Sequence, residues 1–573
     1  MDERWSSTYW AAYWARVVGR RLGRRTFLKY LAVGAGTAGL ALACREEAPQ
    51  VHTPAVPEER PPAAGQGGTL VLHENGDQAS FDYYKTWANR TMTAMSFVYP
   101  RLLKFKTGPD VGPLDFEIVP DLAAAMPEQP DATTYIFKLR PAKWENKPPL
   151  NGRPLTAEDI VKNWERFRVE HPNRAVLVND VDRVEAVAPD TARFVMKRPL
   201  GPFVSHIGHH GVFYIMPYEL FGTGQLEKDM WSAGPFIFRG YQVGSEIRYD
   251  YNPDYFRQGR PYLGGAIIRI VPDTVTAQAQ LRARQLDTTA YQVVVSAADH
   301  ASLKVAMPDA VFVPFFRQTD FSMGMDMNDP VFRDKRVRQA ISMAINRDEL
   351  TRVSGEGQWV LPYGLMDRWY FDPRKNEFAN AKYYLHNPAE ARALLRAAGF
   401  ERLGPYDLIT GNVFWPEQVQ HTEAIQRQLR AAGIETNIRV LPFSEYYATA
   451  ITRANWSNGF ALGSRLVASD PNETFTIFWD PDSPRILAPG LGPILRQDTE
   501  LMGAIERQRR ELDFNRRREL MKEVVNIMAD RMYSVPLIGP RAYHVHQPYV
   551  RNLHWIFSYG LGSEYVPESY KMQ

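Results

Sequence analysis

Helices that run directly into strands are the feature that most restricts the fold of this chain. Residues 424–443, AIQRQLRAAGIETNIRVLPF, have helical periodicity up to Gly433 and then alternate as a strand. Residues 516–539, RRRELMKEVVNIMADRMYSVPLIG, repeat the same order near the end of the chain. This alternation predicts an α/β fold. The 573 residues show no internal repeat with a period of 20–50 residues, and their number suits two or three domains.

Other segments have equally clear signals. Residues 67–75 and 133–140 alternate as strands. A helix is expected after Thr156, which pairs with Asp159 in a capping-box arrangement. In residues 386–400 Asn387 is expected to cap a helix that begins at Pro388 and stops at Gly399.

The N-terminal region contains VGAGTAG at residues 33–39, which fits the G-x-G-x-x-G fingerprint of a dinucleotide site. That fingerprint needs a strand before it, a helix after it and an acidic residue about 20 residues on, all within a βαβ unit. Here the following segment is rich in Pro and Gly, which argues against a strand. The same glycines suit the apolar core of an export signal, since residues 30–43 are uncharged and too short to span a bilayer.

Both flanks of this apolar run favour export. Arg24 and Arg25 begin RRTFLK, which resembles the twin-arginine motif, although Gly23 replaces its usual Ser or Thr. Residues 41–44, ALAC, resemble a lipobox, in which Cys44 would be acylated and become the mature N-terminus. We therefore expect a signal peptide at residues 1–43 and a Pro-rich tether at residues 44–67. The role of the long leader before the arginines stays open.

Composition limits the classes of partner. Without residues 1–43 the chain has 61 Lys and Arg residues against 63 Asp and Glu residues, a net charge of −2. A nucleic-acid-binding protein would favour a basic stripe, so no nucleic-acid partner is expected. The single cysteine allows no internal disulfide and no thiolate metal cluster. We expect neither a cofactor nor a metal.

Six blocks of sequence together resemble family 5 of the bacterial extracellular solute-binding proteins, the peptide/nickel-type receptors of ABC importers. The resemblance extends from about Gly68 to the C-terminus, and the order of the blocks is more specific than any one of them. The blocks are residues 118–144, 151–167, 233–273, 331–350, 387–400 and 425–440.

The resemblance implies two lobes joined by a hinge, with an extra subdomain in the first lobe. By position we expect lobe I at residues 68–318, lobe II at 319–534 and a return to lobe I at 535–573. The crossings are expected near Phe315–Asp326 and near Ser534–Gly539. The implied mechanism is closure of the lobes around a solute, followed by recognition of the closed form by a membrane permease.

The resemblance also implies that ligand contacts lie on loops after strands of both lobes. In lobe I the loop after the first strand offers aromatic rings and an amide, namely Tyr83, Tyr84, Trp87 and Asn89. In lobe II the transition from strand to helix offers Asn412, Phe414 and Trp415. Packing in the core is the alternative role for each aromatic residue.

A third segment, residues 455–481, departs from the pattern of peptide-binding members. Those members hold the ligand's amino group with an Asp four residues before a Pro, and a Trp three residues before that Asp. Counting back from Pro471 places Val467 and Ser464 at these positions. An apolar residue cannot pair with an ammonium group, so oligopeptide specificity does not transfer simply. Arg465 could hold a carboxylate or phosphate instead, and Asp470 completes the expected site residues of this segment.

Histidines cluster at His206, His209 and His210 in SHIGHHGVFY. Imidazoles are common metal ligands, but this spacing matches no established site. On a strand, adjacent His209 and His210 would point to opposite faces. His544 and His546 could share one strand face, which is a weaker indication still.

The sequence thus predicts a monomeric, non-enzymatic solute-binding lipoprotein at the outer face of the cytoplasmic membrane. Its expected partners are an oligopeptide or oligosaccharide solute, an ABC permease, and the membrane through the lipid anchor. The alternatives are an exported enzyme and a solute sensor with the same fold. The sequence contains neither H-E-x-x-H nor G-x-S-x-G, which leaves the enzyme with little support.

Overall fold

A computed structural model describes residues 61–572, except 87, 290–294, 318, 365, 413–416, 467–468 and 559. From Pro62 onward these residues form one compact unit. The expected signal peptide, with Arg24, Arg25 and Cys44, lies outside the described residues. Among the described helices, none is long and apolar enough to cross a bilayer.

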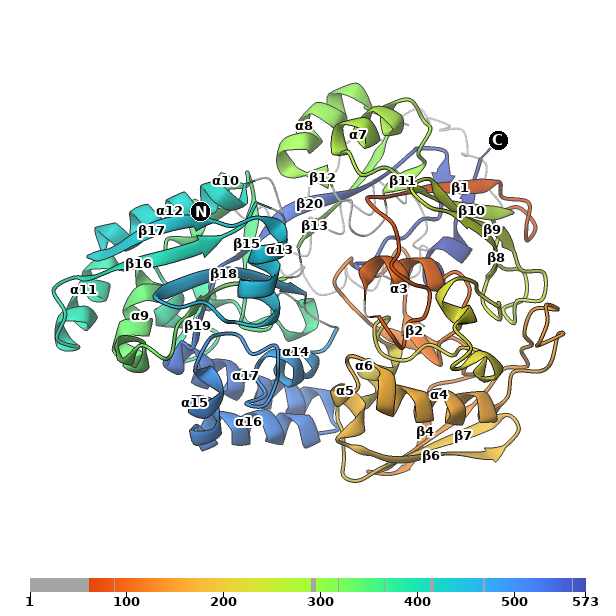
Figure 1. Cartoon of the computed structure of the whole chain (residues 1–573), viewed down its shortest axis with the longest axis horizontal. Helices are drawn as coiled ribbons and strands as arrows, with labels where there is room; N and C mark the ends of the chain where they lie inside the picture. Colours follow the sequence, from red (N-terminus) through yellow and green to blue (C-terminus); the bar gives the residue numbers. More distant parts are fainter. Residues whose placement is uncertain are drawn as a thin grey trace, which may run out of the picture. The chain divides into compact units, whose positions relative to one another are not determined.

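The first lobe is built on a mixed sheet of nine strands (Figure 1). Its path runs β12-β20-β11-β1-β10-β9-β8, and β13 and β15 also pair with β20. The strands are β1 (Thr69–Glu74), β8 (Phe236–Gln242), β9 (Glu246–Tyr251), β10 (Gly265–Ile270), β11 (Thr288–Thr289), β12 (Val295–Ser296), β13 (Val311–Phe316), β15 (Gly357–Trp359) and β20 (Ile538–His546). β1 is parallel to both of its neighbours, β10 and β11.

A four-stranded antiparallel sheet, ordered β4-β5-β7-β6, belongs to the same lobe. Its strands are β4 (Glu128–Asp131), β5 (Thr134–Lys138), β6 (Val181–Ala188) and β7 (Thr191–Met196). Two small ribbons complete the strands of this lobe, β2 (Leu103–Phe105) with β3 (Ile118–Pro120) and β21 (Val550–Arg551) with β22 (Tyr570–Lys571). The helices are α3 (Asn89–Met95), α4 (Ala157–Glu170), α5 (Ala175–Val178), α6 (Phe203–Gly208), α7 (Thr274–Arg282) and α8 (Ala297–Ala306).

The second lobe is built on a five-stranded sheet ordered β17-β16-β18-β14-β19. Its strands are β14 (Thr319–Met325), β16 (Leu403–Thr410), β17 (Ile434–Val440), β18 (Gly459–Leu466) and β19 (Ser534–Pro536). The α-helices are α9 (Lys335–Ala344), α10 (Arg347–Val353), α11 (Pro388–Ala397), α12 (Gln418–Ala431), α13 (Phe443–Tyr446), α14 (Pro471–Phe478), α15 (Leu491–Gln497), α16 (Thr499–Arg510) and α17 (Phe514–Arg531). The α/β class expected from the alternation of helices and strands is confirmed.

Each lobe has its own apolar core. One core extends from Leu70 to Ile268 and takes in the C-terminal segment up to Val566. The other spans Phe321 to Ile538. The two cores share no buried residue, and the partly buried Tyr370 packs against both.

The chain passes directly between the two sheets at β13–β14 and at β19–β20, and β15, which lies between β14 and β16 in the chain, also pairs with the first residues of β20. The chain leaves the nine-stranded sheet after β13 and enters the five-stranded sheet at β14, and it returns between β19 and β20. β14 and β19 are paired with each other, so the two crossings lie side by side. The exact division into lobes at residues 318/319 and 534/535 stays a prediction.

Helix ends follow the sequence signals. Thr156 N donates to Asp159 Oδ2 over 2.9 Å before α4. Asn387 Oδ1 accepts from Glu390 N over 3.1 Å at the start of α11, and Gly399 takes the positive φ of 95° that ends the helix. These local contacts place the helices as the sequence indicated.

Candidate functional site

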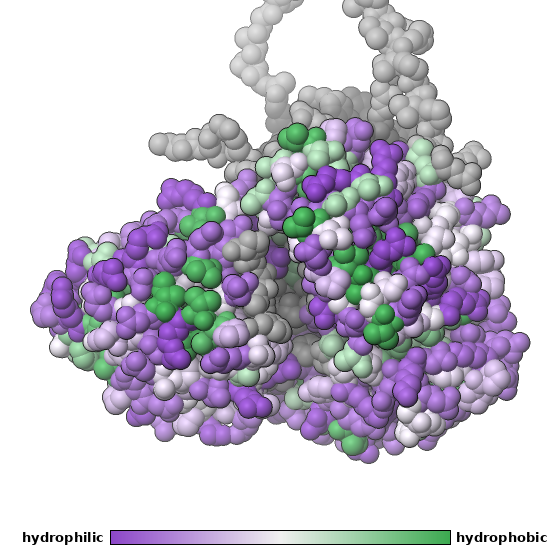
Figure 2. Space-filling model, turned by 45° about the horizontal axis from the view of Figure 1, so that its top comes forward, coloured by the Kyte–Doolittle hydropathy of each residue, from purple (hydrophilic) through white to green (hydrophobic). Residues whose placement is uncertain are grey.

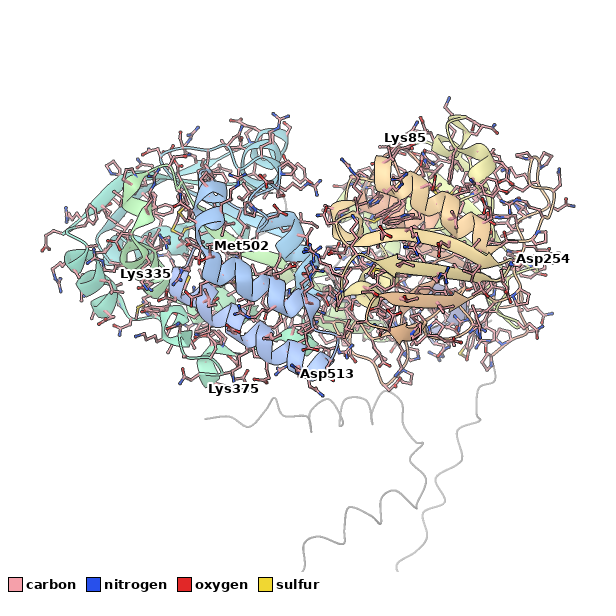
Figure 3. The ribbon with its side chains drawn as sticks, turned by 90° about the horizontal axis from the view of Figure 1, so that it is seen from below. Lys85, Asp254, Lys335, Lys375, Met502 and Asp513 are labelled. Carbon is pink, nitrogen blue, oxygen red and sulfur yellow. The ribbon has the colours of Figure 1, made fainter. Side chains whose placement is uncertain are left out.

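A hollow lies between the two lobes (Figure 2). The crossings β13–β14 and β19–β20 join the lobes, and a second set of contacts joins them through α14 and α16 of lobe II and α5 and α6 of lobe I. Seen from below, α16 and α17 lie beside the four-stranded sheet, and Asp513 marks the turn between these helices (Figure 3). The walls of the hollow and this second set of contacts form the candidate site.

Asp180 is the centre of one cross-lobe contact. It is fully buried in lobe I and pairs with Arg509 and Arg510 of lobe II, the latter over 2.7 Å. Burial alone would raise the pKa of Asp180, but the two guanidinium groups outweigh it and lower the pKa. The backbones also meet here, since Gly201 N donates to Arg509 O over 2.8 Å.

A small cavity of about 80 Å³ lies between the lobes near this contact. Lobe I contributes Phe116, Gly201 and Ser205 to its lining, and lobe II contributes Trp369 and Ser469. A typical pocket for a small molecule has several hundred Å³. This cavity therefore has room for water but not for a solute of ordinary size.

Asp470, one of the expected ligand residues, has no exposed surface. It caps α14 by accepting from Asn472 N over 2.9 Å, and both of its oxygens accept from Arg517 over 2.6 and 2.7 Å. Burial opposes ionisation of Asp470, but Arg517 outweighs it and lowers the pKa. In this structure Asp470 orients the first turn of α14 instead of presenting a free carboxylate.

Of the ligand residues expected in lobe I, the two tyrosines are buried and Asn89 is half-buried. Tyr84 is fully buried, and its hydroxyl lies 2.8 Å from Asn163 Oδ1 and 2.9 Å from Tyr214 O, inside the lobe. Tyr83 is also fully buried, but its hydroxyl has no hydrogen-bond partner among the described residues. Asn89 begins α3 and is half-buried, and Trp87 lies outside the described residues.

The expected lobe II residues are only partly described. Asn412 is exposed, whereas Phe414 and Trp415 lie outside the described residues. Ser464 and Arg465 lie on β18, opposite Phe321 and Asp320 of β14. Their backbone therefore lies beside the first crossing, and their side chains are not described. The role of all these residues in ligand binding stays a prediction.

The structure brings together a group of residues that the sequence did not connect. Glu473, on α14 of lobe II, places Oε2 3.4 Å from His209 Nδ1 and 4.0 Å from His206 Nδ1, both in lobe I. Its Oε1 accepts from Asn173 Nδ2 over 3.3 Å. The only sequence signal was the histidine cluster, since Glu473 is 263 residues or more from each of its histidines. We call Glu473, His206 and His209 the interlobe cluster.

The histidines do not lie on a strand, so the strand interpretation of His209 and His210 is wrong. His206 is in α6 and His209 is the residue that ends it. The rings of His209 and His210 are 4.1 Å apart instead of on opposite faces, because the chain turns as the helix ends. Among the described residues, no group of three or more His, Cys, Asp or Glu is arranged to hold a metal ion.

Burial dominates the electrostatics of the interlobe cluster. It raises the pKa of Glu473 to about 8, with a further contribution from the Asp470 carboxylate. It lowers the pKa of His206 and of His209 to about 3. Burial also raises the pKa of Tyr83 well above its ordinary value, and Glu473 adds to this effect. Asp470 thus caps the first turn of α14, whereas Tyr83 and Tyr84 both belong to the core of lobe I.

Comparison with known proteins finds relatives of similar sequence. The chain is 26% identical over 418 residues to the dipeptide-binding protein of Escherichia coli (strain K12), a match that covers 68% of this chain and 74% of that protein. It is also 26% identical over 413 residues to the probable di/tripeptide-binding protein 5 of Pseudomonas aeruginosa (strain UCBPP-PA14), covering 67% and 74%.

Solved structures share the fold at low sequence identity. The ABC transporter-associated periplasmic binding protein DppA from Helicobacter pylori, in complex with the peptide STSA, has a TM-score of 0.72 at 20% identity, covering 89% of this chain and 99% of that one. The binding protein AgaA from A. tumefacien R10, in complex with agropinic acid, has a TM-score of 0.70 at 19% identity, covering 88% and 99%. A profile described as "Bacterial extracellular solute-binding proteins, family 5 Middle" matches residues 117–483. Since this match covers more than half of the chain, the protein belongs to family 5 of the bacterial extracellular solute-binding proteins.

Proposed function

We propose that this protein captures a small solute between its two lobes and delivers it to an ABC permease. The observation that supports this most is the pair of adjacent crossings between lobes with separate cores. Two neighbouring strand connections act as a hinge, because only a few residues need to change conformation when the lobes close. The contacts between α14, α16 and lobe I are then contacts of the closed form.

The solute class that has most support is peptide-like. The two relatives compared above are named as dipeptide- and di/tripeptide-binding proteins, and a structural neighbour contains a tetrapeptide, STSA. Other neighbours contain agropinic acid and mannopinic acid, so the fold also accepts other solutes. An oligosaccharide is the second candidate, because Val467 stands where peptide-binding members have an Asp.

The protein acts in this proposal as a lipoprotein outside the cytoplasmic membrane. The support is the run from Arg24 and Arg25 to Cys44, which resembles a twin-arginine signal followed by a lipobox. Replacing Cys44 by Ala should release the protein from the membrane fraction, as measured by fractionation of cells that express it. Retention of the variant would contradict the anchor but not the solute-binding function.

The solute-binding function is tested by purifying the protein without residues 1–43 and identifying co-purifying molecules by mass spectrometry. A thermal-shift screen with dipeptides, tripeptides and oligosaccharides follows. A bound solute raises the unfolding midpoint, and the stabilisation grows with the logarithm of one plus the ratio of solute concentration to Kd. If no solute class shifts the midpoint, and a hydrolase or redox activity appears instead, the proposal fails.

A further inference from the structure

The interlobe cluster contains three buried polar atoms that face one another and have no hydrogen-bond partner in the described part of the chain. These are Glu473 Oε2, His206 Nδ1 and His209 Nδ1, and the side chains are at most 6% exposed. Buried polar atoms are nearly always satisfied, so each exception needs an explanation. Here the two histidines belong to lobe I and the carboxyl to lobe II. The group therefore exists only while the lobes touch.

A chain of hydrogen bonds fixes where the His206 proton lies. Arg517 Nε donates to Gln508 Oε1 over 3.1 Å, which directs the Gln508 amide nitrogen to Asn472 Oδ1 over 3.1 Å. The Asn472 amide nitrogen is thereby left to donate to His206 Nε2 over 3.2 Å. A neutral imidazole that accepts at Nε2 carries its proton on Nδ1. His206 thus directs an N–H toward the Glu473 carboxyl.

Among the residues that the structure describes, no buried cation contacts Glu473 directly and would hold it ionised. From lobe I the titratable and charged groups around the cluster are Tyr83, Arg101, His171, Asp180, His206, His209 and His210. From lobe II they are Asp470, Arg509 and Arg517. Arg101 already pairs with Glu564 over 2.6 Å, and Arg517 with Asp470. A buried charge without a partner is costly, so the cluster favours a neutral state that holds one proton on Glu473.

We propose that Glu473, His206 and His209 form a proton-linked latch, in which closing the lobes binds one proton at Glu473 and opening them releases it. This inference rests on the proposed function, because it assumes that the lobes open and close. In this proposal the interlobe cluster makes the opening and closing of the lobes depend on pH.

The direction of the pH effect follows from the two states. In the open form Glu473 meets water and titrates near its ordinary pKa of 4.5, whereas in the closed form its pKa is about 8. Between these values closing takes up a proton, so the closed form becomes less favourable as pH rises toward 8. The histidines act in the opposite direction, since their pKa falls from 6.5 to about 3 on burial. Below pH 6.5 closing must expel their protons and becomes less favourable again.

The latch therefore predicts a bell-shaped dependence of closing on pH. With these pKa values the closing equilibrium constant at pH 7 is about sixfold larger than at pH 9. At pH 5 it is about ninefold smaller than at pH 7. The maximum lies between pH 6 and pH 7.

Closing can be measured by energy transfer between dyes on the two lobes of the full chain. Cys44→Ser removes the single native cysteine. Val187→Cys in lobe I and Val440→Cys in lobe II then provide two exposed labelling positions, since the valines are 46% and 48% exposed. The closed fraction is recorded from pH 5 to pH 9 without added solute, at constant ionic strength.

Glu473→Gln imitates the protonated carboxyl and should remove the alkaline limb of the profile, which is the fall in closing above pH 7. The closing equilibrium constant of this variant should change less than about twofold between pH 7 and pH 9. His209→Gln should keep the alkaline limb and remove the fall between pH 7 and pH 5. Glu506→Gln is the matched control, because Glu506 also contacts lobe I, through Arg198, but is 44% exposed. This control should retain the wild-type profile.

A flat profile in the wild-type protein, or an unchanged alkaline limb in Glu473→Gln, would overturn the latch. Circular dichroism and the melting temperature check that each variant is folded. If Glu473→Gln does not fold, His209→Gln tests the proposal instead. A fall in closing between pH 7 and pH 5 as large as in the wild-type protein would then overturn the latch. The thermal-shift screen measures solute binding independently of the pH profiles of closing. Failure of the latch can therefore be distinguished from failure of the proposed function.

Discussion

Gly201 is the position at which a single added methyl group should oppose closure most directly. A Cβ on this residue of lobe I would lie 1.9 Å from the backbone oxygen of Glu511 in lobe II. An ordinary contact of this kind needs 3.4 Å or more. Gly201→Ala therefore requires the two backbones to separate by about 1.5 Å, unless one of them yields locally.

Local yielding is restricted on the lobe II side. Glu511 ends α16, and Asp513 two residues later caps α17, so the carbonyl is held between two helices. Separation by about 1.5 Å would break the hydrogen bond from Gly201 N to Arg509 O, which is 2.8 Å long. Its loss costs about 0.5–1.5 kcal/mol. With the lost packing, the closed form should weaken by about 1–3 kcal/mol, or roughly 5- to 150-fold in solute affinity.

The assay is titration calorimetry with the solute that co-purifies with the wild-type protein, combined with the dye pair described above. Gly112→Ala is the control, because Gly112 also faces lobe II but its added Cβ would meet its nearest atom only at 4.0 Å. We expect Gly201→Ala to lower affinity and closed fraction together, with little change in melting temperature without solute. Wild-type affinity in this variant would show that the Gly201–Glu511 approach is not part of the closed form.

Further predictions concern two other buried carboxylates, Asp180 and Asp470. Asp180→Asn should lower solute affinity about tenfold or more, because Asp180 pairs with two arginines of lobe II and a hydrogen bond to a charged group contributes about 1.5–3 kcal/mol. Calorimetry measures this loss. Asp182, an exposed neighbour paired within lobe I, provides the control, since Asp182→Asn should leave solute affinity unchanged. Asp470→Asn should lower the free energy of unfolding by about 3 kcal/mol or more, because it leaves the buried Arg517 without its partner. Urea unfolding should show no comparable loss for Asp482→Asn, which is 78% exposed, and an equal loss would contradict a structural role for Asp470.

Elements with local signals could be predicted from the sequence, and the reasons are visible in the structure. α11 begins and ends through contacts among Asn387, Glu390 and Gly399, all within a few residues of one another. α4 likewise begins at the contact between Thr156 and Asp159, which are three residues apart. Such features depend on short-range chemistry, which the sequence displays directly.

The burial of Tyr84 could not be predicted in this way. The aromatic residues after β1 follow a strand end, where ligand contacts are common, and nothing local distinguishes a core position from a cleft position. The structure holds this loop in the core through Asp82, which pairs with Arg166 over 2.6 Å across 84 residues of sequence. Likewise Glu473 meets His209 only because α14 and α6 face each other across the lobes. Pairings at such separations depend on the whole fold.

The polar character of the cross-lobe contacts has a consequence for how the hinge works. An apolar contact would gain about 25 cal/mol for each Å² removed from water, and a large one would hold the lobes closed without solute. Buried ionic contacts gain little net free energy, because desolvation offsets the attraction between the charges. Asp180 with its two arginines and the interlobe cluster thus define one closed geometry while leaving the open form accessible. A bound solute can then shift the equilibrium by its preference for the closed form, and a change in pH can shift it through Glu473.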